Sequence, residues 1–356
     1  AATPLLVLFF NWTLGVYTRF RVGSGKVKTP VLTAAIVLSA LSLFFLGVNN
    51  SAVVLWVSLV WAPLVLPRIF LNFNTRMKSS FLSNAVRGKG PVFVVGGAGY
   101  IGSHVIDQLL QEGFAVRLFD TFIYGKDSID EFDSNSRFEI VEGDVTDIMK
   151  LTEAMSGVSA VVHLAGLVGD PACAVDESFT RHTNVIATRM LKEVAISMGV
   201  PRFVFASSCS VYGGNEAEVD ESSQLNPVSL YAITKIDSEK QLLSLIDETF
   251  CVTILRFATV FGHSRRPRFD LVGNLFTAQA YTEGKITVMG ENQWRPFIHV
   301  KDLARAVVMT LKASPERVRG QTFNVGDSRL NMTIGQLAKE IEQIVRDTPT
   351  NQPVEM

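Results

Sequence analysis

Hydrophobic and polar residues alternate very differently before and after residue 90. Residues 29–67 carry no charged side chain. A helix rises about 1.5 Å per residue, so this run is long enough to cross a hydrocarbon core of ~30 Å twice. The polar residues 49–51 lie near its middle and suit a turn. The pattern predicts transmembrane helices at about 31–48 and 52–71, and the uncharged start of the chain predicts the end of an earlier one at about 1–17.

The charges that flank these segments predict their orientation. Four basic residues and no acid lie between 19 and 28, and five more with no acid lie between 68 and 89. Because positively charged loops stay in the cytoplasm, we expect the 49–51 turn outside and the chain after residue 89 in the cytoplasm. We therefore interpret 1–89 as a multi-pass membrane region. The alternatives are a buried soluble hairpin, an interfacial segment, or a re-entrant segment broken at Pro63 and Pro67.

After residue 90, short apolar runs alternate with segments of helical periodicity, such as 184–198. This βαβα order predicts an α/β fold, a Rossmann-type doubly wound parallel sheet with helices on both faces. We expect a dinucleotide-binding domain at 90–256 and a small substrate-binding portion at 257–356. The runs typical of buried parallel strands lie at 91–95, 115–119, 138–141, 160–164 and 202–205.

Composition narrows the class of function. The 356 residues include 33 Lys and Arg against 34 Asp and Glu, and a formal net charge of -1 gives no basic field for a nucleic acid. Cys173, Cys209 and Cys251 are odd in number and widely spaced, which excludes a disulfide framework and fits a reducing compartment. The histidines show no metal-ligand spacing, so we predict no metal site.

A glycine-rich segment, GGAGYIG at 96–102, follows the first predicted strand and opens a predicted helix. Glycines allow a tight turn and a close approach to a pyrophosphate, whose charge a helix N-terminus favours. Asp120 ends the next strand, near the spacing of roughly 20 residues expected for a ribose-binding carboxylate. An acid at this position repels a 2′-phosphate, so the sequence predicts NAD as the cofactor in preference to NADP.

Ser208, Tyr231 and Lys235 carry the predicted chemistry. Tyr231 and Lys235 are four residues apart and share one face of a helix. A phenol with a pKa of about 10 is a poor base, and a nearby ammonium is expected to lower that pKa. Tyr231 can then take a proton from a substrate hydroxyl while a nicotinamide takes hydride from the same carbon. Ser208, at a strand end, can hydrogen-bond the oxygen on which charge develops.

Together these motifs resemble those of the extended short-chain dehydrogenase/reductases, in the NAD-dependent epimerase/dehydratase group that acts on nucleotide sugars. The likeness runs from about residue 92 to residue 341. The segments that carry it are GGAGYIG at 96–102, Asp120, GDV at 143–145, HLAG at 163–166, Asn184, SSCSVYG at 207–213, YAITK at 231–235, LR at 255–256, VFG at 260–262, RPFIHVKD at 295–302 and FNVG at 323–326.

The resemblance implies a role for each matching residue. Ser208, Tyr231 and Lys235 are the expected catalytic residues, with Asn184 in the proton relay. Ser208 is also expected to bind the sugar nucleotide, together with Asn274, Arg268 and Arg295. Arg265 and Arg266 either add to this anion site or form a solvated loop. The expected NAD contacts are Gly96, Gly99, Tyr100, Ile101, Gly102, Asp120, Asp144, Val145, Leu164, Ala165, Gly166, Tyr231 and Lys235.

Departures from the family pattern discriminate between activities. The 4,6-dehydratases resemble this strand end but carry Asp-Glu where this chain has Cys209 and Ser210, and related decarboxylases keep a Glu where Ser210 stands. Dehydration and decarboxylation are therefore disfavoured. Thr259 replaces an Asn of many 4-epimerases, which leaves the substrate open. The family normally continues beyond a helix at about 333–346, so the resemblance also implies a truncated substrate domain.

We expect a membrane-anchored NAD-dependent nucleotide-sugar epimerase of the UDP-glucose 4-epimerase type, with a homodimer as a possible assembly. Its product would be formed near polysaccharide-building enzymes. A 4-reductase or dehydrogenase, or a dehydratase, of the same family is the enzymatic alternative. A membrane-tethered NAD-binding scaffold is the non-enzymatic one. Residues 1–85 are alternatively part of a larger fused membrane enzyme.

Overall fold

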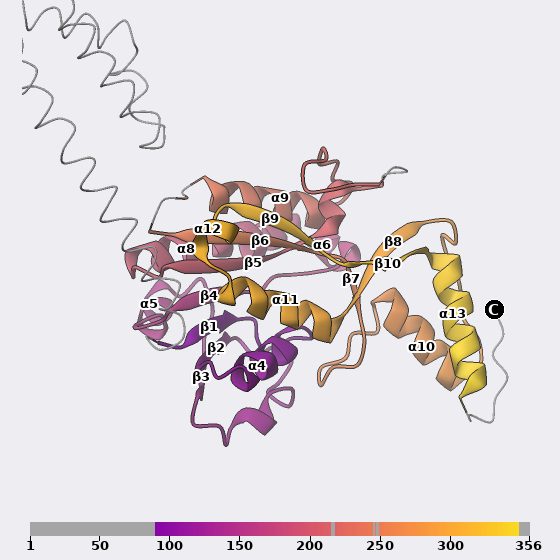
Figure 1. Cartoon of the computed structure of the whole chain (residues 1–356), viewed down its shortest axis with the longest axis horizontal. Coiled ribbons are helices and arrows are strands. Elements are labelled where there is room, and N and C mark those ends of the chain that lie inside the picture. Colours follow the sequence, from indigo (N-terminus) through magenta and orange to yellow (C-terminus); the bar gives the residue numbers. More distant parts are fainter. Residues whose placement is uncertain (1–89, 215–217, 245, 247–248, 349–356) are drawn as a thin grey trace, which may run out of the picture. The chain divides into compact units, whose positions relative to one another are not determined.

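The computed structural model describes residues 90–214, 218–244, 246 and 249–348 (Figure 1). These residues belong to the second of the two units into which the chain divides, Leu82–Met356. The predicted membrane helices at 1–17, 31–48 and 52–71 lie outside the described residues, so the membrane region stays a prediction. Within the described ranges, no helix combines the length and the apolarity that a bilayer crossing requires.

Seven strands form one sheet in which every neighbouring pair is parallel, in the order β3-β2-β1-β4-β5-β6-β9. The predicted Rossmann-like α/β fold is therefore confirmed. The strands are β1 (Val92–Val95), β2 (Val116–Asp120), β3 (Phe138–Glu142), β4 (Ala160–His163), β5 (Arg202–Ser208), β6 (Cys251–Phe257) and β9 (Gln321–Val325).

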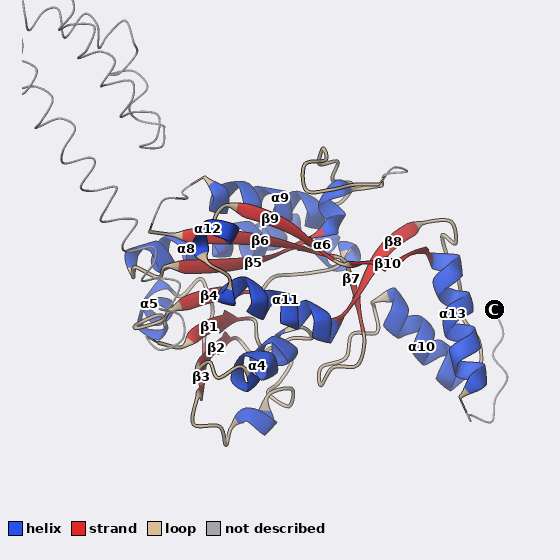
Figure 2. Ribbon diagram, in the orientation of Figure 1, coloured by secondary structure: helices blue, strands red, loops and turns tan. Residues whose placement is uncertain are grey.

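Helices cover both faces of this sheet (Figure 2). Val92 and Val94 of β1 pack on one side, and Phe93 and Val95 pack on the other, because successive side chains of a strand point to opposite faces. All four are buried, which is why the strand is a continuous apolar run. The helices are α4 (Gly102–Gln111) and α11 (Val300–Lys312) on the first side, and α5 (Ile148–Ala154), α8 (Ala187–Ser197) and α9 (Leu230–Leu243) on the second.

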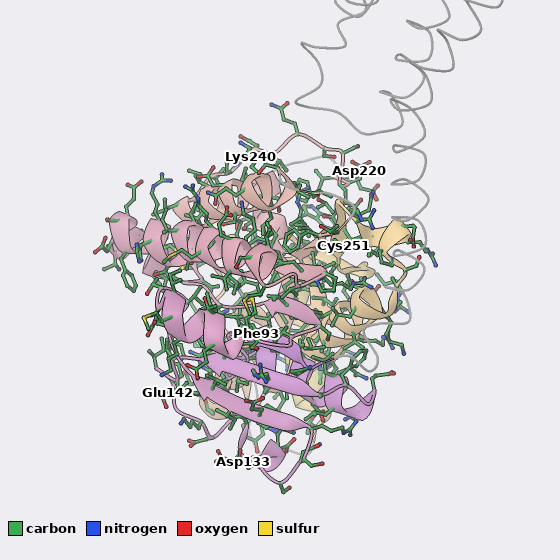
Figure 3. The ribbon with its side chains drawn as sticks, turned by 90° about the vertical axis from the view of Figure 1, so that its left-hand side faces the viewer. Phe93, Asp133, Glu142, Asp220, Lys240 and Cys251 are labelled. Atoms are coloured by element: carbon green, nitrogen blue, oxygen red, sulfur yellow. The ribbon has the colours of Figure 1, made fainter. Side chains whose placement is uncertain are left out.

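The side chains follow the same division between interior and surface. Figure 3 shows Phe93 and Cys251 inside the ribbon and Asp133, Glu142 and Lys240 at its periphery. Phe93 and Cys251 are buried, whereas the three charged residues are exposed. Hydrophobic burial on both faces of the sheet thus supplies the core on which the site is built.

A second lobe has its own sheet, in the order β10-β8-β7. Phe276, Phe297, Ala338 and Ile341 form its core with neighbouring apolar side chains. Thr333 caps the last helix, and its side chain and that of Gln336 form a reciprocal capping box. The elements are β7 (Thr259–Phe261), α10 (Val272–Glu283), β8 (Trp294–His299), β10 (Asp327–Thr333) and α13 (Ile334–Asp347).

Short elements connect these layers. The predicted helix at 184–198 is α8 preceded by a π-helical turn, η2, and such turns often occur at functional sites. The other short elements are the 3₁₀ turns η1 (Asp130–Phe132) and η3 (Cys209–Tyr212), the π-helical turn η2 (His182–Ile186), and the helices α6 (Asp170–Val175), α7 (Glu177–Arg181) and α12 (Pro315–Val318).

Residues after 257 contribute to both lobes, which the sequence boundary at 256/257 does not anticipate. Strand β9 pairs with β6 in the large sheet, and Leu303 and Val307 of α11 are buried in the core beside α4. The chain thus leaves the large sheet after β6, builds most of the second lobe and returns. The carboxyl ends of β1, β2, β4 and β5 meet at one edge, where the sequence predicts the ligands.

Candidate active site

The glycine segment turns tightly between β1 and α4. Gly96 has φ +80°, and a Cβ atom on it would lie 2.6 Å from the backbone of Ala165. A Cβ atom on Gly102 would lie 2.4 Å from the Cα atom of Gly97. Both positions therefore require glycine. Ile101 is the N-cap residue of α4 and makes no side-chain capping hydrogen bond, so the helix begins directly at the turn, where a pyrophosphate site is expected.

Asp120 ends β2 beside this turn. Its Oδ2 atom accepts a hydrogen bond from Ala98 N at 3.0 Å, and its Oδ1 atom accepts one from Phe122 N at 3.0 Å. Among the described residues, Phe122 is the one non-glycine residue with a positive φ, +54°. The carboxylate is thus fixed, and each oxygen keeps a second lone pair for a ribose hydroxyl. The site fits a dinucleotide without a 2′-phosphate.

The ends of β3 and β4 complete this side of the crevice. Asp144 is exposed, whereas Val145 next to it is buried. Leu164 N and Ala165 N both donate to Val95 O, at 2.9 and 3.0 Å. The backbone after β4 is therefore folded against the end of β1, where the glycine turn begins. This arrangement brings the predicted NAD contacts of four strand ends to one edge of the sheet.

Asn184 lies in the π-helical turn and is buried. Its Oδ1 atom accepts from Leu167 N at 2.7 Å, and its Nδ2 atom donates to Leu167 O at 2.9 Å and to Thr234 Oγ1 at 3.2 Å. A Cβ atom on Gly166 would lie 3.1 Å from the same Oδ1 atom. Asn184 thus joins the loop after β4 to α9. Its role in a proton relay stays a prediction.

The structure brings Ser208, Tyr231 and Lys235 together. Ser208 ends β5, and Tyr231 and Lys235 lie in the first half of α9, whose N-cap is Ser229. The side chains of Tyr231 and Ser208 share a hydrogen bond. The Nζ atom of Lys235 lies 5.7 Å from the centroid of the Tyr231 ring and donates to Ala206 O at 2.7 Å. A phenol, a hydroxyl and an amine therefore meet at the end of the central strands.

The pKa values of Tyr231 and Lys235 in the structure differ from what the sequence suggests. Burial raises the pKa of Tyr231 to about 12, because it disfavours the phenolate more than the hydrogen bond with Ser208 and the charge of Arg268 favour it. Burial also lowers the pKa of Lys235 to about 8, an effect that the charge of Glu239 opposes. The charge of Lys235 is not among the main effects on the pKa of Tyr231, and its amine donates to a backbone carbonyl.

Asn274 ties the second lobe to the glycine turn. Its Oδ1 atom accepts from Gly262 N at 2.9 Å, and its Nδ2 atom donates to Arg268 O at 2.9 Å and to the Tyr100 hydroxyl at 3.1 Å. The Tyr100 hydroxyl in turn donates to Gly262 O at 2.7 Å. The predicted contact of Asn274 with a sugar nucleotide is not tested by this geometry. Sequence reasoning missed the bond between the cofactor turn and α10.

Two predicted substrate-binding arginines, Arg268 and Arg295, come from the part of the chain that builds the second lobe. Arg268 Nε donates to Asp270 Oδ1 at 3.1 Å, and the charge of Arg268 lowers the pKa of Tyr231 against the effect of burial. Arg295 is exposed, and its charge acts on the Cys209 thiol. A guanidinium suits a diphosphate, and the binding role of both arginines stays a prediction.

Arg265 and Arg266 lie against the loop that follows Asp120. Arg265 pairs with Glu131, and the guanidinium of Arg266 lies 3.5 Å from the centroid of the Tyr124 ring. Both guanidinium groups therefore bind protein side chains.

The two residues after Ser208 have no acidic group. Ser210 Oγ donates to Ser208 Oγ at 2.9 Å. Burial raises the pKa of the Cys209 thiol to about 11, so this side chain is neutral at neutral pH. Neither side chain is a carboxylate acid or base.

Sequence reasoning also missed a buried charge pair behind the site, Glu239 and Arg256. The sequence contains a signal for this pair. Arg256 is the one charged residue of a mostly apolar strand, and Glu239 follows Lys235 at helical spacing. Buried charges need partners, so each of these residues predicts the other.

Comparison with known proteins gives consistent matches. The family model described as NAD dependent epimerase/dehydratase family matches residues 92–326. The chain is 29% identical over 279 residues to the dTDP-D-glucose 4,6-dehydratase of Mus musculus, covering 74% of this chain and 75% of the relative. It is 30% identical over 251 residues to an uncharacterized UDP-glucose epimerase of Bacillus subtilis, covering 66% of this chain and 76% of the relative.

Similar solved structures include the UDP-glucose 4-epimerase of Thermotoga maritima with UDP-glucose, at 28% identity and a TM-score of 0.64. MoeE5 in complex with UDP-glucose and NAD is also 28% identical, with a TM-score of 0.62. Each of the two matches covers 75% of this chain and 85% of the other.

Proposed function

Because the chain belongs to the NAD dependent epimerase/dehydratase family, we propose that it is a nucleotide-sugar 4-epimerase of the UDP-glucose 4-epimerase type. The family is NAD-dependent, and NAD is the cofactor of this chain. Epimerases, dehydratases and a decarboxylase occur among its relatives at similar identity, so identity alone does not select the reaction. The observation that supports epimerisation is the Ser208–Tyr231–Lys235 group followed by a thiol and a hydroxyl in place of two carboxylates.

Tyr231, Ser208 and Lys235 each have a separate role in the proposed reaction. Tyr231 takes the proton of the sugar 4-hydroxyl and later returns it. Ser208, already hydrogen-bonded to Tyr231, holds the same sugar oxygen as it becomes a carbonyl. Lys235 supplies a positive charge beside the phenol. Bound NAD would accept a hydride from C4 and give it back. Between the two transfers the 4-keto sugar rotates and presents its other face. It must not react at C5 or C6 in that time, so the pocket must lack an acid and base that act there.

Cys209 and Ser210 meet that requirement. A 4,6-dehydration needs an acid and a base near C5 and C6, and the Cys209 thiol, with a pKa of about 11, stays protonated and is a weak acid. Ser210 is engaged with Ser208. These two residues therefore favour return of the hydride to C4 over loss of water.

The test is incubation of the purified protein with UDP-, dTDP-, GDP- and CDP-sugars, followed by separation of the products. We expect one sugar to be converted to its 4-epimer without net formation of NADH. In Tyr231→Phe we expect turnover to fall by roughly 10²- to 10⁴-fold, because the general base is lost, with NAD still bound. Steady accumulation of NADH, or a 4-keto-6-deoxy product, would replace the proposal by a dehydrogenase or a dehydratase.

A further inference from the structure

A buried pair of opposite charges lies directly behind the catalytic residues. The side chains of Arg256 on β6 and Glu239 on α9 are 6% and 4% exposed. Arg256 donates to the carboxylate twice, from Nη2 to Oε2 at 2.7 Å and from Nε to Oε1 at 3.1 Å. This forked geometry gives a guanidinium and a carboxylate their strongest and most directional contact.

Three more side chains complete the Glu239 network, which consists of Ser207, Tyr212, Glu239, Arg256 and Asn324. Ser207 Oγ donates to Glu239 Oε1 at 2.5 Å. Arg256 Nη1 donates to the Tyr212 hydroxyl at 2.8 Å, and that hydroxyl donates to Asn324 Oδ1 at 2.7 Å. The network therefore joins α9, β5, η3, β6 and β9, and both carboxylate oxygens have partners.

The network and the catalytic residues share the same two elements. Ser207 immediately precedes Ser208 on β5, and Glu239 lies one turn beyond Lys235 on α9. Lys235 in turn donates to Ala206 O at 2.7 Å. The end of β5 is thus bound to α9 at two successive turns. A shift of Glu239 would change the separation of Ser208 and Tyr231.

Glu239 also places a negative charge near Lys235. Burial lowers the pKa of Lys235, and the charge of Glu239 is the largest of the effects that raise it again. Cys173 on α6, His163 on β4 and Tyr231 on α9 are the other titratable groups that face the amine. The carboxylate itself faces the Arg256 guanidinium and the Tyr212 hydroxyl.

Stability does not account for this arrangement. Removing two charges from water costs about as much as their attraction returns, so a buried ion pair contributes little net stability. Its hydrogen bonds instead fix the geometry of the elements that carry them. The elements fixed here are those of the catalytic hydroxyl, phenol and amine.

We propose that Glu239, held by Arg256, is a positioning residue for the proposed reaction: it fixes the strand end that bears Ser208 against the helix that bears Tyr231 and Lys235, and keeps a negative charge beside Lys235. The inference rests on the proposed function. It assigns Glu239 no contact with substrate or cofactor.

The first test is Glu239→Gln, which keeps the size of the side chain and removes its charge. Without that charge the phenolate–ammonium form of the Tyr231 and Lys235 pair loses stability relative to the phenol–amine form. We expect kcat to fall roughly 10- to 100-fold, as a small misplacement in an active site does. The rise of kcat/KM with pH should also move to lower pH, with little change in KM. Glu139→Gln on β3, which breaks an ion pair with Arg117 at 2.6 Å, is the matched control. It should change neither kcat nor the pH dependence of kcat/KM.

Ser207→Ala separates position from charge. It removes the bond between β5 and Glu239 and leaves the carboxylate in place, so kcat should fall while the pH profile stays where it is. This variant also tests the inference if Glu239→Gln does not fold. A Glu239→Gln protein with wild-type kcat and an unmoved pH profile, but a lower melting temperature, would reduce the pair to a structural role.

A substrate-free measurement keeps this test independent of the proposed function. Titration of ¹³C-labelled lysine by NMR, with the Lys235 signal identified in Lys235→Arg, should give a lower pKa in Glu239→Gln than in the wild type. If the wild type epimerises no sugar, the proposed function fails, but this shift still supports the electrostatic part of the inference. An unchanged Lys235 pKa overturns that part, whatever the substrate.

Discussion

Burial determines the chemistry of individual residues in this site. Tyr231 and Lys235 both lose water, and each is pushed toward its neutral form, the phenol toward a pKa of about 12 and the amine toward about 8. The sequence shows the residue types and their spacing on a helix. It does not show that Lys235 donates to Ala206 O, because the position of a backbone carbonyl on another strand is a property of the fold.

The activity should therefore depend on pH in a defined direction. The Tyr231 and Lys235 pair releases its first proton near pH 8, and the form that has lost one proton includes a phenolate beside an ammonium. We expect kcat/KM to rise with pH to about 8 and then to level off. The measurement is a pH profile of epimerisation. If kcat/KM instead fell as the pH was raised to about 8, the assignment of Tyr231 as the base would be contradicted.

At the scale of elements, the sequence predicts best what is short, apolar and continuous. The predicted strands at 91–95 and 138–141 differ from β1 and β3 by one residue at one end. In β1 the reason is burial on both faces, which leaves little other choice of residue. The π-helical turn that holds Asn184 was missed, since its hydrophobic spacing is that of an ordinary helix.

The turn between β1 and α4 depends on close backbone approach. In Gly102→Ala the new methyl group would lie 2.4 Å from the Cα atom of Gly97, so helix and turn must separate. We expect a loss of about 1–3 kcal/mol in the free energy of unfolding and weaker NAD binding, measured by denaturant titration and calorimetry. Gly214→Ala, where no atom lies within 4 Å of the new Cβ, is the control and should bind NAD normally.

The bond between the lobes is open to a similar test. Asn274→Ala removes the partner of Gly262 N, Arg268 O and the Tyr100 hydroxyl at once. We expect the protein to lose about 1–3 kcal/mol of stability, because partly buried polar groups are left without partners, and the KM for the nucleotide sugar to rise. Unchanged stability together with a higher KM would instead mean that the amide serves the substrate alone.

At the scale of the whole molecule, the order of segments along the chain does not follow the order in space. The sequence suggests a division at 256/257, yet β9 and α11 return to the large sheet. Apolar periodicity identifies a strand or helix but not its neighbour, so this return was not predictable. The Glu239 network was not predictable as a set for the same reason, since Asn324 reaches it only through β9.

The location of the chain is a prediction at this scale, since it depends on residues 1–89. The basic clusters around the uncharged runs predict that the 49–51 turn lies outside and the catalytic residues lie in the cytoplasm. In whole cells, a Ser51→Cys variant should react with a membrane-impermeant maleimide. The native chain, whose Cys173, Cys209 and Cys251 lie after residue 90, should react only after the cells are broken and the protein is denatured, because Cys173 and Cys251 are buried in the fold. Labelling of neither protein in intact cells would contradict this topology.

The return of β9 has a consequence for synthesis on the ribosome. Strand β6 is complete once Phe257 has been made, but its neighbour β9 follows only at Gln321–Val325. Until then the β6 edge of the nascent sheet is unpaired and apolar. The hydrogen bond between Tyr212 and Asn324, which completes the network around Arg256, cannot form before β9 is made. Late pairing of distant segments slows folding and prolongs exposure to aggregation. Ribosome-bound chains that stop before Gln321 should therefore engage chaperones, and those extended well past Val325 should release them.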